Sequence, residues 1–152
     1  MALTDFSSFP KRGVIIGIDP GTKTLGIAAC DGLRMIATPV ETIQRGKKLA
    51  PALKKLFEIY DDRNAVGLVI GLPLNMDGSE GPRAQSARAL AHNICQQRDL
   101  PILLQDERLS SAEAERAMIA ADLSRARRAE IIDASAAAII LKAAMDRLEH
   151  QS

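Results

Sequence analysis

Three acidic residues, Asp19, Glu107 and Asp133, lie where an isolated carboxylate has little structural reason to be. Asp19 and Glu107 each end a short apolar run that is typical of a buried strand. This position places them where strands of a sheet end and face solvent or a cleft. Asp133 lies inside the apolar helical stretch 131–140, where an unpaired charge costs free energy. Carboxylates that converge from two strand ends and a helix offer hard oxygen ligands to Mg²⁺ or Mn²⁺. The pattern predicts a two-metal site and phosphodiester chemistry.

The residues after Asp19 bear on its role. Asp before Pro20 and Gly21 is a common way to leave a strand, so Asp19 could be a turn residue. In favour of a functional role, Pro20 keeps Asp19 extended and Gly21 leaves the space before it open. Thr22 and Lys23 then offer a hydroxyl and a cation to a phosphate. Similar turns occur in actin-like and sugar-kinase ATPases, but those proteins repeat the half-domain and are much longer.

Glu107 and Asp133 also have simpler interpretations. Glu107 could belong to a solvated charge run, 106–108, although a strand end is where open α/β sheets place ligands. Asp133 could form a structural ion pair with one of the arginines before it, and a metal ion is the more economical partner. Those arginines are Arg125, Arg127 and Arg128.

Composition limits the remaining possibilities. The chain has 152 residues, 47% of them apolar and 26% charged, as expected of one globular domain. A net charge of +1 means that any basic surface is local, and 3% aromatic residues argue against a base-stacking platform. Cys30 and Cys95 predict no disulfide and a cytoplasmic location. No segment resembles a signal peptide or a membrane span, and His92 and His150 lack zinc-ligand spacing.

Apolar periodicity predicts the element order βββαβαβαα, and hence an α/β three-layer domain with helices on both faces of a five-stranded mixed sheet. Residues 1–12 are expected to form a flexible arm, and residues 13–150 a single domain. Strands are expected at 13–19, 24–30, 35–42, 66–71 and 101–105, and helices around 49–60, around 82–95, from 110 and around 132–143, the last after a basic stretch, 124–128.

Four motifs together resemble the YqgF family, also called RuvX-like. They are VIIGIDPGTK (14–23), GLPLNMDGSEG (71–81), DERLSS (106–111) and IDASAA (132–137). The similarity extends over residues 13 to 148. It implies a ribonuclease H-type fold with strand order 3-2-1-4-5, and a nuclease that trims the 5′ end of the 16S ribosomal RNA precursor in the bacterial cytoplasm. The catalytic acids of the family fall on Asp19, Glu107 and Asp133.

The chain departs from related patterns in two ways. RuvC-type resolvases carry an acid on the fourth strand, whereas this strand ends in residues 70–73 without one, and the acid has moved to strand five. YqgF proteins also carry more basic residues than this chain does, so contacts to substrate phosphates are reduced. The less basic positions are Thr24, Ala126, Ala129, Glu130 and Ala134.

The leading interpretation is a metal-dependent nuclease that acts on structured RNA. The loop 72–81 should border the active cleft and be mobile without substrate. Candidate substrate contacts are Thr22, Lys23, Asn75, Asp77, Ser79, Arg83, Arg108, Arg125, Arg127 and Arg128. Each could instead belong to a solvated surface or a plain connector.

Two other functions remain open. A resolvase of branched DNA should be a symmetric dimer, because a four-way junction is cut twice. A non-catalytic nucleic-acid-binding module in ribosome assembly or transcription would also fit the weak basic patches and few aromatic residues. The sequence leaves open RNA against DNA, endonuclease against exonuclease, and monomer against homodimer.

Overall fold

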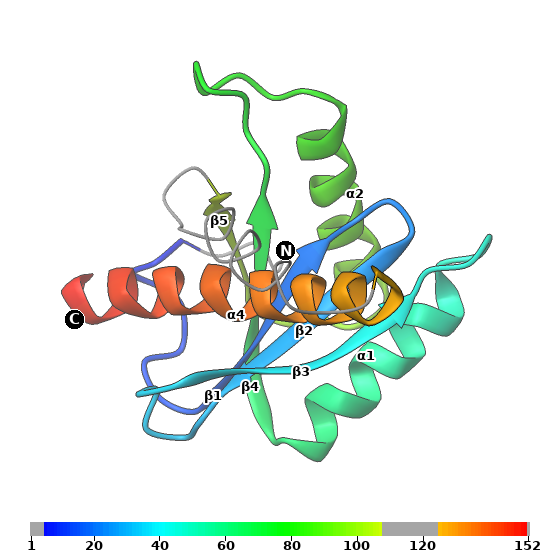
Figure 1. The fold of residues 1–152 in the computed structure, drawn as a ribbon. Helices are drawn as coiled ribbons and strands as arrows, with labels where there is room; N and C mark the ends of the chain where they lie inside the picture. Colours follow the sequence, from blue (N-terminus) through cyan, green and yellow to red (C-terminus); the bar gives the residue numbers. More distant parts are fainter. Residues whose placement is uncertain (1–4, 108–124, 152) are drawn as a thin grey trace.

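A computed structural model describes residues 5–107 and 125–151, with the side chains of 125–133 and 150–151 excepted. A single five-stranded sheet forms the centre of the fold (Figure 1), in the order β3-β2-β1-β4-β5. The strands are β1 (Val14–Pro20), β2 (Thr24–Cys30), β3 (Ala37–Gln44), β4 (Ala65–Leu72) and β5 (Ile102–Asp106). The helices are α1 (Ala50–Asp62), α2 (Pro82–Gln97) and α4 (Arg125–Gln151).

The sheet is mixed, as predicted. β1 pairs antiparallel with β2 and parallel with β4, and β5 continues the parallel part beyond β4. The order 3-2-1-4-5 is therefore confirmed, and β1 is the central strand. Because β1, β4 and β5 run in the same direction, their carboxyl ends meet at one end of the sheet.

The starts of β3 and of the last helix differ from the prediction. β3 begins at Ala37 rather than at residue 35, because Oδ1 of Asp31 accepts hydrogen bonds from the backbone N–H groups of Met35 and Ile36 and holds them in the turn. The basic stretch 124–128 does not precede the last helix, since α4 already includes residues from Arg125 onward. The helix expected from residue 110 lies outside the described residues.

Helices cover both faces of the sheet, which confirms the three-layer prediction (Figure 1). Ile16 and Ile18 of β1 pack in the layer that α1 and α2 complete, whereas Ile15 packs with Leu141 of α4. This division follows from the alternation of side chains along a strand. No helix among the described residues is long and apolar enough to cross a membrane.

α4 lies very close to the middle of the sheet. A Cβ atom on Gly17 of β1 would lie 2.8 Å from Cβ of Leu141 and 3.1 Å from the backbone oxygen of Ala137. The helix therefore rests on a strand position that carries no side chain. Small residues on the buried side of α4, such as Ala137 and Ala144, permit the same close approach from the helix.

The segment before β1 packs on the domain. Phe9 is only 2% exposed, and its ring fills the space in front of Gly67 at the start of β4. The guanidinium of Arg34 donates hydrogen bonds to the backbone oxygens of Gly13 and Pro10, both at 2.8 Å. The sequence predicted a flexible arm over residues 1–12 and did not predict that Phe9 is buried.

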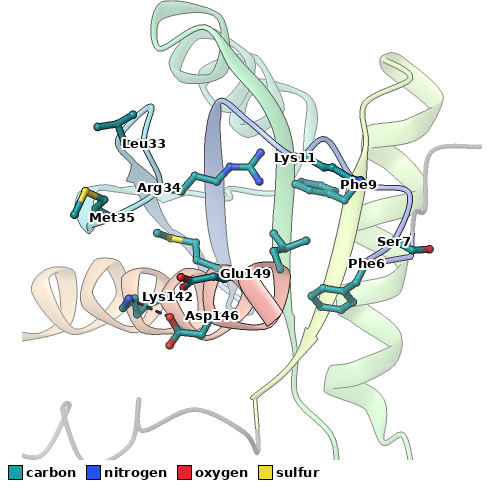
Figure 2. A pocket seen from close by; sticks show the side chains of 12 residues that line it. Phe6, Ser7, Phe9, Lys11, Leu33, Arg34, Met35, Lys142, Asp146 and Glu149 are labelled. Carbon is teal, nitrogen blue, oxygen red and sulfur yellow. Dashed lines mark hydrogen bonds and ion pairs between the residues drawn. The ribbon is translucent and has the colours of Figure 1, made fainter. Parts of the chain in front are cut away.

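A hollow of about 560 Å³ opens between this segment, the β2–β3 turn and the last turns of α4 (Figure 2). Its lining includes Phe6, Phe9, Arg34 and Met35. Since Phe9 lies against the beginning of β4, the hollow is at the end of the sheet where the parallel strands start. It is therefore separate from the end that carries the predicted acids.

The contact between Phe9 and Gly67 can be tested by a double-mutant cycle. Phe9→Ala should lower the free energy of unfolding by about 3 kcal/mol, the usual cost of truncating a buried Phe. Gly67→Ala should also destabilise, because its Cβ would lie 2.7 Å from Cε1 of Phe9. In the Phe9→Ala background the same change should cost much less, since the clash is gone. Additive losses in urea unfolding would show that the two residues do not touch.

Candidate active site

Asp19 lies at the carboxyl end of the central strand, where the sequence predicted it. It pairs with Gly26 of β2 and is only 6% exposed. Alternation along β1 puts it on the same face as Gly17, which is the face covered by α4. One carboxylate oxygen, Oδ1, is buried and accepts no hydrogen bond within the described part of the chain, although Asp19 does interact with its surroundings. A buried carboxylate on this face is placed to bind a cation.

Glu107 approaches the same face from β5. Its Oε1 and Cδ atoms would lie 3.1 and 3.2 Å from a Cβ atom on Gly71, the residue next to the end of β4. Ile18 pairs with Ile70, so the same register puts Asp19 beside Gly71. Gly71 thus lies between the two acids in the sheet, and its missing side chain leaves the room that Glu107 occupies.

The third acid can be located only by its backbone. Asp133 lies in α4, one helical turn before Ala137, whose carbonyl oxygen faces Gly17. Its side chain lies outside the described residues, as do those of Arg125, Arg127 and Arg128, and Arg108 lies outside them altogether. Among the residues that the structure does describe, no three potential metal ligands come together. The three-acid cluster therefore stays a prediction.

The turn after Asp19 is held by a residue that the sequence analysis missed. The backbone N–H of Gly21 donates to the oxygen of Thr24 at 2.9 Å, which closes the turn and leaves Thr22 and Lys23 exposed. Arg45, directly after β3, donates from its backbone N–H to the oxygen of Lys23 and from its guanidinium to the oxygen of Gly21, at 2.9 and 2.7 Å. The signal available in the sequence was a basic residue immediately after β3, the strand that pairs with β2.

The loop after β4 begins at the same end of the sheet and extends away from it before α2 (Figure 1). Its candidate contacts are bonded to one another: Asn75 donates to Oγ of Ser79 at 3.0 Å, and Ser79 donates to Oδ1 of Asp77 at 2.6 Å. All three are exposed, as is Arg83 in the first turn of α2. The loop after β4 thus ends in an exposed polar tip whose side chains bind one another.

An ion pair joins this loop to α2. Arg88 donates two hydrogen bonds to Glu80, at 2.7 and 2.8 Å, and these hold the pKa of the Glu80 carboxyl below its ordinary value. Both side chains are substantially exposed, so the pair adds little to stability. The charges of Glu80 and Arg88 offset each other. Arg83, in the first turn of α2, has no such ion pair among the described residues.

The family described as "RuvX: Holliday junction resolvase" matches residues 13–147. The chain belongs to the RuvX family. A relative from Bradyrhizobium sp. BTAi1, named "Putative pre-16S rRNA nuclease", is 57% identical over 93% of this chain and 88% of its own length. A relative of the same name from Cereibacter sphaeroides KD131 is 55% identical over 97% of this chain and 92% of its own. The predicted family resemblance is confirmed.

Solved structures agree with the ribonuclease H-like fold. Thermus thermophilus RuvC has a TM-score of 0.56 at 16% identity, covering 90% of this chain and 96% of that protein. RuvC from T. thermophilus in complex with a Holliday junction substrate has a TM-score of 0.55 at 12% identity, covering 91% and 97%. At these identities the likeness concerns the fold of the RuvX chain.

The space at Gly71 gives a direct test of the site geometry. Gly71→Ala would bring Cβ within 2.8 Å of Cδ1 of Ile140 and 3.1 Å of Oε1 of Glu107, so both side chains must shift. We expect a loss of about 1–2 kcal/mol in stability, as in other overpacked sites. We also expect a smaller rise in melting temperature on adding Mn²⁺, because Glu107 is displaced. Gly32→Ala, which meets nothing within 4 Å, is the control and should change neither.

The polar tip of the loop can be tested in the same way. Asn75→Ala and Asp77→Ala remove exposed hydrogen bonds, so each should change the free energy of unfolding by no more than about 0.5 kcal/mol. Nuclease activity should fall more if the tip contacts substrate, as the sequence predicts. Asp62→Ala, at the exposed end of α1, is the control. Parallel losses of stability and activity would identify the tip as a structural turn.

Proposed function

We propose that this RuvX protein is a metal-dependent nuclease that hydrolyses phosphodiester bonds in structured RNA, processing the 5′ end of the 16S ribosomal RNA precursor in the cytoplasm. The observation that carries the proposal is the position of Asp19 and Glu107, which approach one face of the sheet on either side of Gly71. Carboxylates at that end of an α/β sheet are in the usual position for ligand binding. The names of the relatives support the choice of substrate.

Asp19, Glu107 and Asp133 would hold Mg²⁺ or Mn²⁺. The first two supply only oxygen donors and come from neighbouring parts of the fold, which fits hard divalent cations. Asp133 would complete the set from α4, whose backbone passes Gly17 one turn later. Bound there, two such ions would activate the attacking water and stabilise the leaving oxygen.

The remaining candidates would position the RNA. Thr22 and Lys23 are exposed on the turn that directly follows Asp19, and Arg83 begins α2 at the same end of the sheet. Contacts of this kind bind phosphates without reading sequence. Arg108, next to Glu107 in the chain, and Arg125, Arg127 and Arg128, which precede Asp133, would extend the basic surface.

Cleavage of branched DNA is the second candidate. The observation in its favour is the fold shared with RuvC, together with the description of the family. Such an enzyme needs two active sites related by symmetry to cut both strands of a junction. A homodimer in sedimentation velocity, with cleavage of four-way DNA and not of RNA, would favour it; a monomer would favour RNA processing.

The decisive experiment compares Asp19→Asn, Glu107→Gln and Asp133→Asn with the unmodified protein. Each variant should lose cleavage of a structured RNA, in a panel with single-stranded RNA and four-way DNA, under Mg²⁺ or Mn²⁺. Glu58→Gln, an exposed acid of α1, should cleave normally. Full activity in any of the three variants would remove that residue from the proposed site.

Melting curves complete the test. Asp19→Asn should keep or raise the melting temperature without metal, because removing one charge relieves repulsion among clustered acids. Metal at about 100 times its Kd should stabilise the unmodified protein by about 2.7 kcal/mol, or roughly 5–10 °C, and the variant much less. A sharp loss of stability in Asp19→Asn, with an equal metal effect on both proteins, would make Asp19 a structural turn residue.

A further inference from the structure

A second hollow, of about 250 Å³, lies beside the turn that follows Asp19. Its lining comes from the β1–β2 turn, the connection from β3 to α1, and α2. The lining residues are Thr22, Arg45, Gly46, Lys47, Leu49 and Ser86. They provide two cations and two hydroxyl groups and include no carboxylate, so the hollow has the chemistry of an anion site.

Arg45 is already held in place at this hollow. Its guanidinium donates to the oxygen of Gly21 at 2.7 Å and its backbone N–H to the oxygen of Lys23 at 2.9 Å, which fixes it against the turn. A guanidinium carries five N–H donors in a rigid plane, so one bond to a carbonyl leaves others for an oxyanion. Arg45 thus brings a preorganised positive group to the hollow.

Among the described residues, the first turns of α1 and α2 carry no acidic side chain that could offset this positive charge. α1 starts at Ala50, directly after the lining residue Leu49, and its first turn contains no acidic residue. The first turn of α2 contains none either. The amino end of α1, at Leu49, therefore adds positive potential to that of Arg45 and Lys47.

The hollow and the acids lie on different faces at the same end of the sheet. Thr24 pairs with Gln44, so Arg45 and Lys47 follow the end of β3 at the level where the hairpin turns after Asp19. Leu49 packs with the layer of α1 and α2, whereas Asp19 faces α4. A group bound in the hollow is therefore displaced from the bond that the acids would cleave.

We propose that this hollow binds a phosphodiester group of the RNA strand, several ångströms from the cleaved bond, through Arg45 and Lys47 with the hydroxyls of Thr22 and Ser86. The inference rests on the nuclease function proposed above and adds a subsite to it. The strand would cross the end of the sheet from the face of α4 to the hollow. Binding at this second point orients the strand and so contributes to affinity.

Lys47→Gln tests the subsite, with Lys48→Gln as a matched control one residue away. Both lysines are exposed, but only Lys47 lines the hollow. The probe is a fluorescent RNA hairpin with a single-stranded 5′ extension, titrated in EDTA so that binding is measured without cleavage. Lys47→Gln should bind roughly tenfold more weakly, the effect of one charged hydrogen bond. The slope of log K against log salt concentration should also become less steep by about one unit.

A second pair of variants adds charge rather than removing it. Ser86→Asp places an anion in the hollow and should also weaken RNA binding, by roughly tenfold or more. Gln85→Asp adds the same charge to the neighbouring exposed position of α2, which does not line the hollow, and should have a smaller effect. In Mn²⁺ both Lys47→Gln and Ser86→Asp should raise KM and leave kcat nearly unchanged, because the chemistry occurs at the acids.

The outcomes separate this subsite from the nuclease function. If the unmodified protein binds and cleaves RNA, but Lys47→Gln binds RNA as tightly as Lys48→Gln does, the subsite is overturned and the nuclease function stands. If the unmodified protein neither binds nor cleaves, both fail. If inorganic phosphate raises the melting temperature, Lys47→Gln abolishes that rise, and RNA affinity is unchanged, the hollow is a free-phosphate site and the proposal is wrong.

Discussion

The close contact between α4 and the sheet is the constraint on which the site depends. Gly17 and Gly71 carry no side chains, so the helix can approach β1 at Leu141 and β4 at Ile140. Protein interiors are closely packed, so larger side chains at these two positions would push the helix away from the sheet. Because the helix lies so close to the sheet, Asp19, Glu107 and Asp133 could belong to one site.

The two ends of the sheet are stabilised by different kinds of contact. At the carboxyl ends of the parallel strands, exposed turns and loops surround Asp19 and are held by polar contacts such as those of Arg45. At the opposite end, Phe9 and Arg34 fasten the segment before β1 with a buried ring and two hydrogen bonds. Apolar packing thus secures one end, and the other keeps charged groups accessible to a polyanionic substrate.

Much of this arrangement could be predicted from the sequence. Uninterrupted apolar runs identified β1 and β4 as buried strands, the change to helical periodicity identified α1 and α2, and the motifs supplied the strand order. Phe9 was missed because one aromatic residue in a polar segment has no periodicity, and its partner Gly67 is distant in sequence. Arg45 was missed because its role depends on how β3 pairs with β2, which local patterns do not reveal.

Gly71 also limits how this chain can vary. A side chain at that position would meet Ile140 of α4 and the carboxylate of Glu107. A larger residue at position 71 therefore displaces either the helix or the carboxylate. A change at this one position in the sheet would have to be accompanied by a change in α4 or directly after β5.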